Sequence, residues 1–254
     1  MKIVSWNFRC QWDRADGKNC VIHRAGYAYD KIAKERPEVI AFQEIRPVTF
    51  ELLKKLLPEY DFFGSQRTAE FGEEGLYIAW RKDSFALMGS ETFWLSPTPY
   101  VAGSRFQNQS DCTRVCVMAK LRDLKTNECY RLWNIHLDHI SDEARRLGLE
   151  CLFKFIGHFS VMDTTPHIVL GDFNATPESE TMQWCEAQKG FTDVSKGFET
   201  TFHGFGTENN FKIDFIYVSD ELVAKTQKTE LWTDEHDGVY LSDHYPVFVD
   251  VTIG

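Results

Sequence analysis

The chain has 254 residues, which suits one large domain or two small ones and is enough to bury a sizeable core. Hydrophobic residues make up 43% of it, and its 20 Phe, 9 Tyr and 7 Trp argue against a disordered chain. The net charge of −10 at pH 7 excludes a diffuse affinity for polyanions based on overall charge, and leaves open a cleft with a local positive field or a bound metal.

Apolar runs rich in β-branched and aromatic residues recur along the chain and predict strands. They occupy residues 2–7, 39–44, 75–80, 114–121, 130–136, 167–174, 212–219 and 246–253. Helical patterns lie between some of them, at 24–36, 49–57, 141–159 and 178–188, with Ser141 and Asp142 as N-cap candidates for the third. Because strands and helices are mixed over the full length without a linker, we expect a single α/β domain spanning residues 1–254.

Two stretches between the predicted elements read as long loops, at 95–113 and 196–211. Loops of this length in a compact domain are often functional, and an ordinary surface excursion is the alternative.

The cysteines and the apolar runs bear on the cellular compartment. The seven cysteines are an odd number and include no C-x-x-C pair, which predicts reduced thiols. No run has the length of a membrane span, and the opening MKIVSWN enters a strand pattern without a signal-peptide core. We therefore expect a cytoplasmic protein without a membrane span, and nothing in the sequence indicates an obligate protein partner.

Polar side chains stand at the ends of several predicted strands. They are Asn7, Glu44, His136, Asp172 with Asn174, Asp214, and Asp243 with His244. Because strands of one sheet place their ends along a common edge, residues far apart in sequence can meet there. We interpret Gly171 as the residue that breaks its strand pattern; Asp172 and Asn174 would then face the same way if both are extended.

These residue types suit phosphoryl chemistry. Mg²⁺ prefers oxygen ligands and is usually held by one or two carboxylates, a role that fits Glu44 with Asn7 nearby. An Asp–His pair suits acid/base work or stabilisation of charge on a phosphoryl oxygen. Asp214 is flanked by apolar strand residues, where an acid is costly unless it is paired. The set predicts attack of water on phosphorus with metal-stabilised charge.

Each of these residues also has a structural interpretation. Asn7 could end a strand, Glu44 could reach solvent, and Asp172 with Asn174 could form a turn or cap the helix near 178. Asp243 and His244 could form a turn before Pro246. The H-x-x-H spacing of His136 and His139 suggests zinc, but on a strand running into a turn the two side chains face opposite ways and no cysteine accompanies them.

Six short motifs together resemble the endonuclease/exonuclease/phosphatase (DNase I-like) superfamily. They are WN (6–7), QE (43–44), NIHLDH (134–139), GDFN (171–174), IDFI (213–216) and SDH (242–244). The motifs keep the order of that superfamily and span nearly the whole chain, and NIHLDH and TFHGF (201–205) look most like its small uncharacterised bacterial members.

The resemblance implies a four-layer sandwich of two packed, mostly antiparallel β-sheets flanked by helices. It implies Mg²⁺, which Mn²⁺ may replace, with Glu44 as principal ligand, Asn7 as its neighbour and Asp243 as a further acid beside the metal. The implied catalytic residues are Asp172 as base, Asn174 as the amide that holds nucleophile and phosphate, His136 at the phosphate or leaving group, and His244 oriented by Asp214.

Four further residues are candidates for substrate contact: Arg114, Asp138, His139 and His203. Each has an alternative, since Arg114 could be solvated, Asp138 and His139 could cap the helix at 141, and His203 could pack its loop. The function we expect is Mg²⁺-dependent phosphodiester hydrolysis of a nuclease-like kind. The alternatives are a phosphomonoesterase for a small metabolite or lipid headgroup, and a non-catalytic binding module. The phosphorylated substrate would be a nucleic acid, a nucleotide or a small phosphoester.

Overall fold

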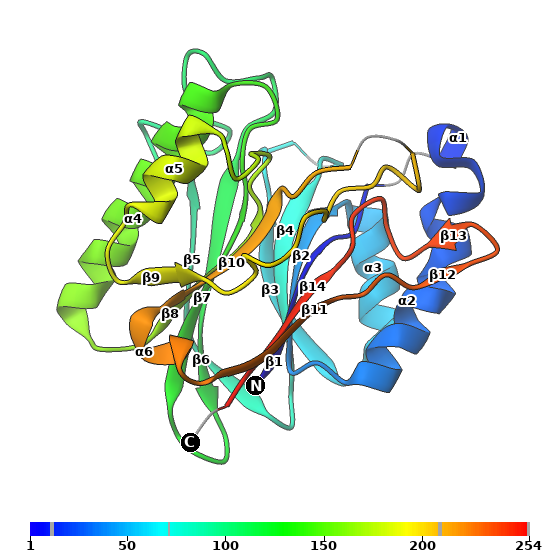
Figure 1. Ribbon diagram of the computed structural model, residues 1–254, viewed down its shortest axis with the longest axis horizontal. Coiled ribbons are helices and arrows are strands. Elements are labelled where there is room, and N and C mark those ends of the chain that lie inside the picture. The colour runs from blue at the N-terminus through cyan, green and yellow to red at the C-terminus, as the bar shows by residue number, and fades with distance from the viewer. Residues whose placement is uncertain (11–12, 71, 208–209, 253–254) are drawn as a thin grey trace.

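The computed structural model describes residues 1–10, 13–70, 72–207 and 210–252. Within them, two six-stranded β-sheets pack face to face between helices, so that Figure 1 shows four layers. The N-terminus lies at the bottom of that view, and the first strand leads from there to the opposite edge of the sandwich. The predicted fold class is confirmed.

The first sheet has the strand order β11-β14-β1-β2-β4-β3. Its strands are β11 (Thr226–Leu231), β14 (Val247–Val251), β1 (Lys2–Asn7), β2 (Val39–Ile45), β4 (Gly75–Arg81) and β3 (Tyr60–Gln66). β1 and β2 are parallel and their neighbours pair antiparallel. Its outer face is covered by α2 (Val21–Glu35) and α3 (Pro47–Leu56), whose Ile32 and Leu53 pack with Trp6, Ile40 and Phe42.

The second sheet has the order β5-β6-β7-β8-β10-β9. Its strands are β5 (Phe85–Trp94), β6 (Val115–Asp123), β7 (Cys129–His136), β8 (His167–Asp172), β10 (Asp214–Ser219) and β9 (Phe191–Asp193). Here β7 and β8 are the parallel pair. Its outer face is covered by α4 (Asp142–Met162) and α5 (Glu180–Glu186), and Leu149 and Met182 pack against Trp133 and Val169.

The two sheets bury a common apolar layer and one polar bridge. Ile3, Ala41, Ile78, Val117 and Leu170 belong to the layer. The bridge joins two residues of the motifs, because the Gln43 amide donates to Asn134 Oδ1 at 2.7 Å while Asn134 Nδ2 donates to two carbonyls of the first sheet. These hydrogen bonds offset part of the cost of burying the pair and join the two sheets, although Gln43 Oε1 has no partner among the described residues.

Short elements complete the chain. They are α1 (Asp13–Asp16), the 3₁₀ helix η1 (Gly17–Asn19), α6 (Asp220–Val223), and the two-stranded ribbon of β12 (Glu235–His236) and β13 (Val239–Tyr240). No helix of the described residues is long and apolar enough to cross a membrane. All seven cysteines are free.

The strands missing from the sequence-based prediction are mostly edge strands. β3, β5, β9 and β11 are the four outermost strands of the two sheets, and the two-residue strands β12 and β13 were also missed. An edge strand meets water along one side and carries polar residues, as in TQKTEL of β11, so its apolar pattern is weak. The predicted helices are confirmed, with α2 starting earlier, at Val21, and α4 running on to Met162.

We predict that His167 stays neutral well below the ordinary pKa of histidine. Trp133 Nε1, which can only donate, lies 3.0 Å from His167 Nδ1, and Ser160 Oγ lies 3.1 Å from the other ring nitrogen. Burial and the charge of Arg131 lower the pKa of His167 to about 4. The pKa of His167 in the unfolded chain is about 6.5, so unfolding below that pH takes up a proton. The free energy of unfolding therefore decreases as the pH falls from 6.5 toward 4, by up to about 3 kcal/mol.

NMR titration of the ring checks this directly. In His167→Asn the side-chain oxygen can still accept the hydrogen bond from Trp133, but the residue does not titrate. Between pH 6.5 and 4.5, the free energy of unfolding in urea is therefore expected to fall less in this variant than in wild type. A His167 pKa at or above 6.5 would contradict the expectation.

Candidate active site

Strand register brings the predicted site residues to one edge of the sandwich. β1 and β2 are parallel with Asn7 opposite Gln43, so Glu44 follows beside Asn7. β7 and β8 are parallel with His136 opposite Asp172, and antiparallel β10 begins with Asp214 opposite that same Asp172. The carboxyl ends of four strands therefore meet the start of a fifth, and His244 enters this edge just before β14.

Two backbone features aim the carboxylates. The pairing of β2 with β4 shifts register between Phe42 and Ile45, and Glu44 within this bulge has φ of 60°. Bulges re-aim side chains, and non-glycine residues with positive φ persist where the surroundings enforce them, often at functional sites. On β8, Gly171 has φ of 145°, and a Cβ there would lie 1.9 Å from the Ile135 carbonyl oxygen. Gly171 therefore lies inside the strand rather than ending it, and lets β8 pass close to β7 up to Asp172.

Asn7 links the two carboxylates from the two sheets. Its Nδ2 donates to Glu44 Oε1 at 3.1 Å and to Asp172 Oδ2 at 2.9 Å, while its Oδ1 accepts from the Arg9 N–H at 3.0 Å. Glu44 Oε2 accepts from the Cys10 N–H at 3.0 Å. Burial alone would raise the pKa of Glu44, but these hydrogen bonds outweigh it and the pKa is lowered. Glu44 is thus ionised, with lone pairs free on both oxygens.

His244 and Asp214 form a buried ion pair beside Asp172. His244 Nδ1 lies 2.8 Å from Asp214 Oδ2, and His244 Nε2 lies 3.8 Å from Asp172 Oδ2. Burial alone would lower the pKa of His244, but the carboxylates of Asp214 and Asp172 raise it to about 10. Burial and the charge of Asp214 raise the pKa of Asp172 to about 7. The site therefore joins an imidazolium to a carboxyl group that titrates near neutrality.

His136 is the second histidine at this edge and is neutral. Its Nε2 lies 3.5 Å from Asp172 Oδ2. Burial and the charge of Arg114 hold the pKa of His136 well below its ordinary value. A neutral imidazole there can donate or accept a hydrogen bond without adding charge.

The strand predicted over residues 167–174 ends at Asp172, so Asp172 and Asn174 are not both extended. Asn174 has φ of 48°, in the left-handed region that asparagine tolerates. Its N–H donates to Asp172 Oδ1 at 2.8 Å, and its side-chain amide donates to the Leu137 carbonyl at 3.0 Å. The turn foreseen as the structural alternative forms, and both residues nevertheless face the same cleft.

A cleft of about 400 Å³ opens at this edge. Eight predicted residues line it: Glu44, Arg114, His136, His139, Asp172, Asn174, Asp243 and His244. Asn7 and Asp214 are not in the lining but hold residues that are. Both predicted loops contribute, because Cys112 comes from 95–113, and Phe202 and Phe211 come from 196–211.

Asp138 and His203 lie away from the lining. Asp138 accepts from the backbone N–H groups of Ile140 and Ser141 and from the backbone and hydroxyl of Ser110, so it ties the 95–113 loop to the start of α4. The N-cap of α4 is Ser141, as predicted. His203 stacks on Tyr245 with ring centroids 3.9 Å apart, and its Nδ1 accepts from the Gly206 N–H. The contacts of both residues are structural.

Asp243 lies at the rim beside Arg9. Its Oδ2 is 3.6 Å from Arg9 Nε, and its other oxygen accepts from Ser242 Oγ. Burial raises the pKa of Asp243. Arg9 also forms two hydrogen bonds with Asp16, so its positive charge is shared between two acids.

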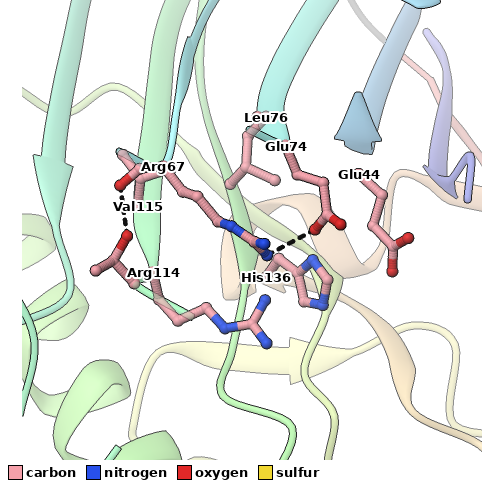
Figure 2. Close-up of a pocket in the computed structure, with 9 residues that line it drawn as sticks. Glu44, Arg67, Glu74, Leu76, Arg114, Val115 and His136 are labelled. Atoms are coloured by element: carbon pink, nitrogen blue, oxygen red, sulfur yellow. Dashed lines mark hydrogen bonds and ion pairs between the residues drawn. The ribbon is translucent and has the colours of Figure 1, made fainter. Parts of the chain in front are cut away.

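The sequence analysis missed Arg67 and Glu74, which Figure 2 shows next to Glu44 and His136. Arg67 follows β3 and its Nη1 lies 2.6 Å from Glu74 Oε2, while Glu74 precedes β4. Burial and the charge of Glu44 raise the pKa of Glu74. The signal for Glu74 was present in the sequence, since an antiparallel strand begins at the edge where its parallel neighbours end. The signal for Arg67 was not, because β3 was not predicted.

The donor set fits a hard divalent cation. Glu44, His136 and Asp172 offer ligand atoms within 4.8 Å of one another, and so do Asp172, Asp214 and His244. Of these, Glu44 and Asp172 supply the oxygen donors that Mg²⁺ prefers, whereas His244 carries a proton and is occupied by Asp214. A third group joins Cys10, Glu44 and Glu74, and no group in the described part of the chain contains His139.

Comparison with known proteins places this site in a known context. The profile described as "Endonuclease/Exonuclease/phosphatase family" matches residues 4–244. No curated protein matches the sequence.

Solved structures share the fold over their full length. The endonuclease/exonuclease/phosphatase from Bacteroides vulgatus is 27% identical with a TM-score of 0.90, covering 99% of this chain and 98% of its own. A functionally unknown conserved protein from Enterococcus faecalis is 27% identical with a TM-score of 0.87, covering 99% of both chains. A mannosyl-6-phosphatase from Bacteroides thetaiotaomicron is 21% identical with a TM-score of 0.88, covering 100% of both, and at that identity shows the fold alone.

Proposed function

This chain belongs to the endonuclease/exonuclease/phosphatase family, and from that premise we propose that it hydrolyses a phosphoester bond with the help of Mg²⁺, for which Mn²⁺ can substitute. The observation that carries the proposal is the meeting of Glu44, Asp172 and His244 in one cleft, with Asn7 and Asp214 holding them from behind. Phosphoester hydrolysis is the activity of this family, and the proposal extends it to these residues and this metal.

The cation would be held by Glu44, and the Asn7 amide keeps the Glu44 carboxylate beside that of Asp172. When bound, Mg²⁺ neutralises the charge that develops on the phosphoryl oxygens and orients the phosphate. Glu44 suits this role because it is half-buried and yet ionised.

Asp172 is the base and His244 the fixed positive charge in this proposal. A carboxylate whose pKa lies near the working pH is suited to accept the proton of the attacking water. His244, kept protonated by Asp214, stabilises a phosphoryl oxygen without having to reorganise. Asn174 and neutral His136 supply hydrogen bonds to the phosphate or the leaving oxygen.

Two other functions fit the site less well. A non-catalytic binding module is disfavoured because none of Glu44, Asp172, Asn174 and His244 is replaced. A long nucleic acid is disfavoured by the net charge of −10, because backbone-tracking surfaces are normally basic. A nucleotide or a small phosphoester fits the charge and the cleft of about 400 Å³ better.

We predict that Mg²⁺ raises the melting temperature of the wild-type protein and that Glu44→Gln removes most of this rise. The amide keeps the shape of the side chain but not its charge. Removing a residue that only hydrogen-bonds a metal ligand typically lowers metal affinity ~10–100-fold, and the loss of Mg²⁺ affinity in Glu44→Gln is expected to be larger. Thermal shift against Mg²⁺ concentration measures it.

Glu51→Gln on the exposed face of α3 is the matched control and should respond to Mg²⁺ like wild type. An unchanged Mg²⁺ response in Glu44→Gln would remove Glu44 from the metal site.

A further inference from the structure

Arg114 is a buried guanidinium without a carboxylate partner. The residue is 5% exposed, and its Nε has no hydrogen-bond partner among the described residues. No ion pair joins it to a carboxylate within the described part of the chain. Its one side-chain hydrogen bond runs from Nη2 to His139 Nδ1 at 3.0 Å. Because arginine only donates, that nitrogen of His139 carries no proton, and the imidazole does not neutralise Arg114.

A buried charge of this kind is costly unless something compensates it. Other arginines near the site have compensation, since Arg67 pairs with Glu73 and Glu74, and Arg9 pairs with Asp16. Arg114 differs from them and lines the cleft. Figure 2 shows its guanidinium extended toward the space below Arg67 and beside His136. The arrangement leaves Arg114 free to bind an anion in the cleft.

The space beside Arg114 is a narrow part of the cleft. The recess bounded by Glu44, Arg67, Glu74, Arg114 and His136 has a volume of only about 10 Å³, which is the size of one water. Leu76 and Val115 complete its wall. An oxygen atom fits there, whereas the alkyl or sugar group of a second ester does not. Phe202, Phe211 and Ile213 also line the cleft and offer apolar surface to the one ester group of a monoester.

We propose that Arg114, positioned by His139, binds a non-bridging oxygen of a terminal phosphate, so that the substrate is a phosphomonoester. The inference rests on the proposed function and narrows it, reversing the preference for a phosphodiester drawn from the sequence. A monoester dianion brings two negative charges and three non-bridging oxygens, which suit a cleft that is lined by the positive charges of His244 and Arg114 and could also hold a cation at Glu44. A diester brings only one charge and two such oxygens, so it would leave the buried charge of Arg114 less well compensated.

The reaction balances without any further reactant. Water forms a P–O bond as the ester P–O bond breaks and its proton passes to Asp172, which returns it, through solvent, to the departing alcohol oxygen. The products are an alcohol and inorganic phosphate.

The test compares 4-nitrophenyl phosphate with bis(4-nitrophenyl) phosphate in Mg²⁺. Wild type is expected to have the higher kcat/KM for the monoester. Arg114→Met is expected to lower that value by ~100-fold or more, and the diester value by less than ~5-fold, because a charged donor to the phosphoryl group is lost. Arg122→Met, at the far end of β6, is the matched control and should leave both values unchanged.

A binding measurement separates this inference from the catalytic one. Calorimetry of inorganic phosphate with the Asp172→Asn protein in Mg²⁺ should show binding at least ~10-fold weaker when Arg114→Met is added, and Arg114→Lys should restore part of it. Faster cleavage of the diester, or equal losses on both probes, would overturn the inference and leave the proposed function standing. If wild type and Asp172→Asn cleave both probes equally slowly, the proposed function itself fails.

Discussion

Asp172→Asn is expected to remove ~10³-fold or more of the activity and to stabilise the metal-free protein at pH 8. The activity falls because an amide cannot accept the proton of the attacking water, a contribution of ~10²–10⁴-fold on its own. The stability rises because burial and the charge of Asp214 disfavour the ionised carboxylate, and so raise the pKa of Asp172 to about 7.

The sign of the stability effect follows from linkage. The pKa of Asp172 is about 7 folded and near 3.8 unfolded, so unfolding releases a proton between these values and stability is lost as pH rises from about 4 to about 7. The full shift corresponds to about 4 kcal/mol at pH 8. The amide in the Asp172→Asn protein would keep one hydrogen-bond acceptor, so it can accept from Asn7 or from Asn174 but not from both. The lost hydrogen bond reduces the gain in stability by about 1 kcal/mol. A net gain of about 1–3 kcal/mol is expected from these two contributions.

Urea unfolding in EDTA at pH 5 and pH 8 measures this effect. Asp193→Asn, which removes a buried acid that instead pairs with Lys212 at 2.7 Å, is the contrasting control and should lose stability. Wild-type activity in Asp172→Asn, or lower stability than wild type at pH 8, would contradict the assignment.

His244→Ala is expected to reduce kcat by ~10²–10⁴-fold and, unlike Asp172→Asn, to destabilise the protein by about 3–5 kcal/mol at pH 7. The substitution removes the cation that lies 2.8 Å from Asp214 and leaves that carboxylate buried alone. Because the folded pKa of His244 is raised to about 10 from an unfolded 6.5, its stabilisation is fully present below pH 6.5 and is lost as pH rises through 10.

A double-mutant cycle with Asp214→Asn tests the pair. The double variant should lose less stability than the two single variants lose together, because it no longer leaves one buried charge without its partner. Strict additivity, or an equal destabilisation by His244→Ala at pH 7 and pH 10, would show that the ion pair does not form.

The central strands of both sheets were predictable from the sequence, and the edge strands were not. Strands buried on both faces, such as β2 and β8, read as continuous apolar runs because helices cover one face and the partner sheet covers the other. The edge strands β3, β5, β9 and β11 carry mixed sequences whose pairing is decided by their neighbours in the sheet.

The candidate site shows the same division. Asp214 between two apolar residues implied a partner, and His244 is that partner. The left-handed turn at Asn174 was not predictable, because the prediction assumed that the extended backbone of β8 continued past Asp172. The pairing of Arg67 with Glu74 depended on a contact between β3 and β4 that local pattern does not encode. Arg114 was identified as a candidate from its place at a strand start, but its lack of a carboxylate partner is a property of the folded chain.

Phosphoester cleavage in H₂¹⁸O tests the central claim most directly, namely that this edge of the sandwich directs water onto phosphorus. With Mg²⁺ and 4-nitrophenyl phosphate, the wild-type protein is expected to release phosphate carrying one ¹⁸O and an unlabelled alcohol, at a rate that Asp172→Asn and EDTA both abolish. Label in the alcohol, or release that persists at the wild-type rate in Asp172→Asn, would contradict it.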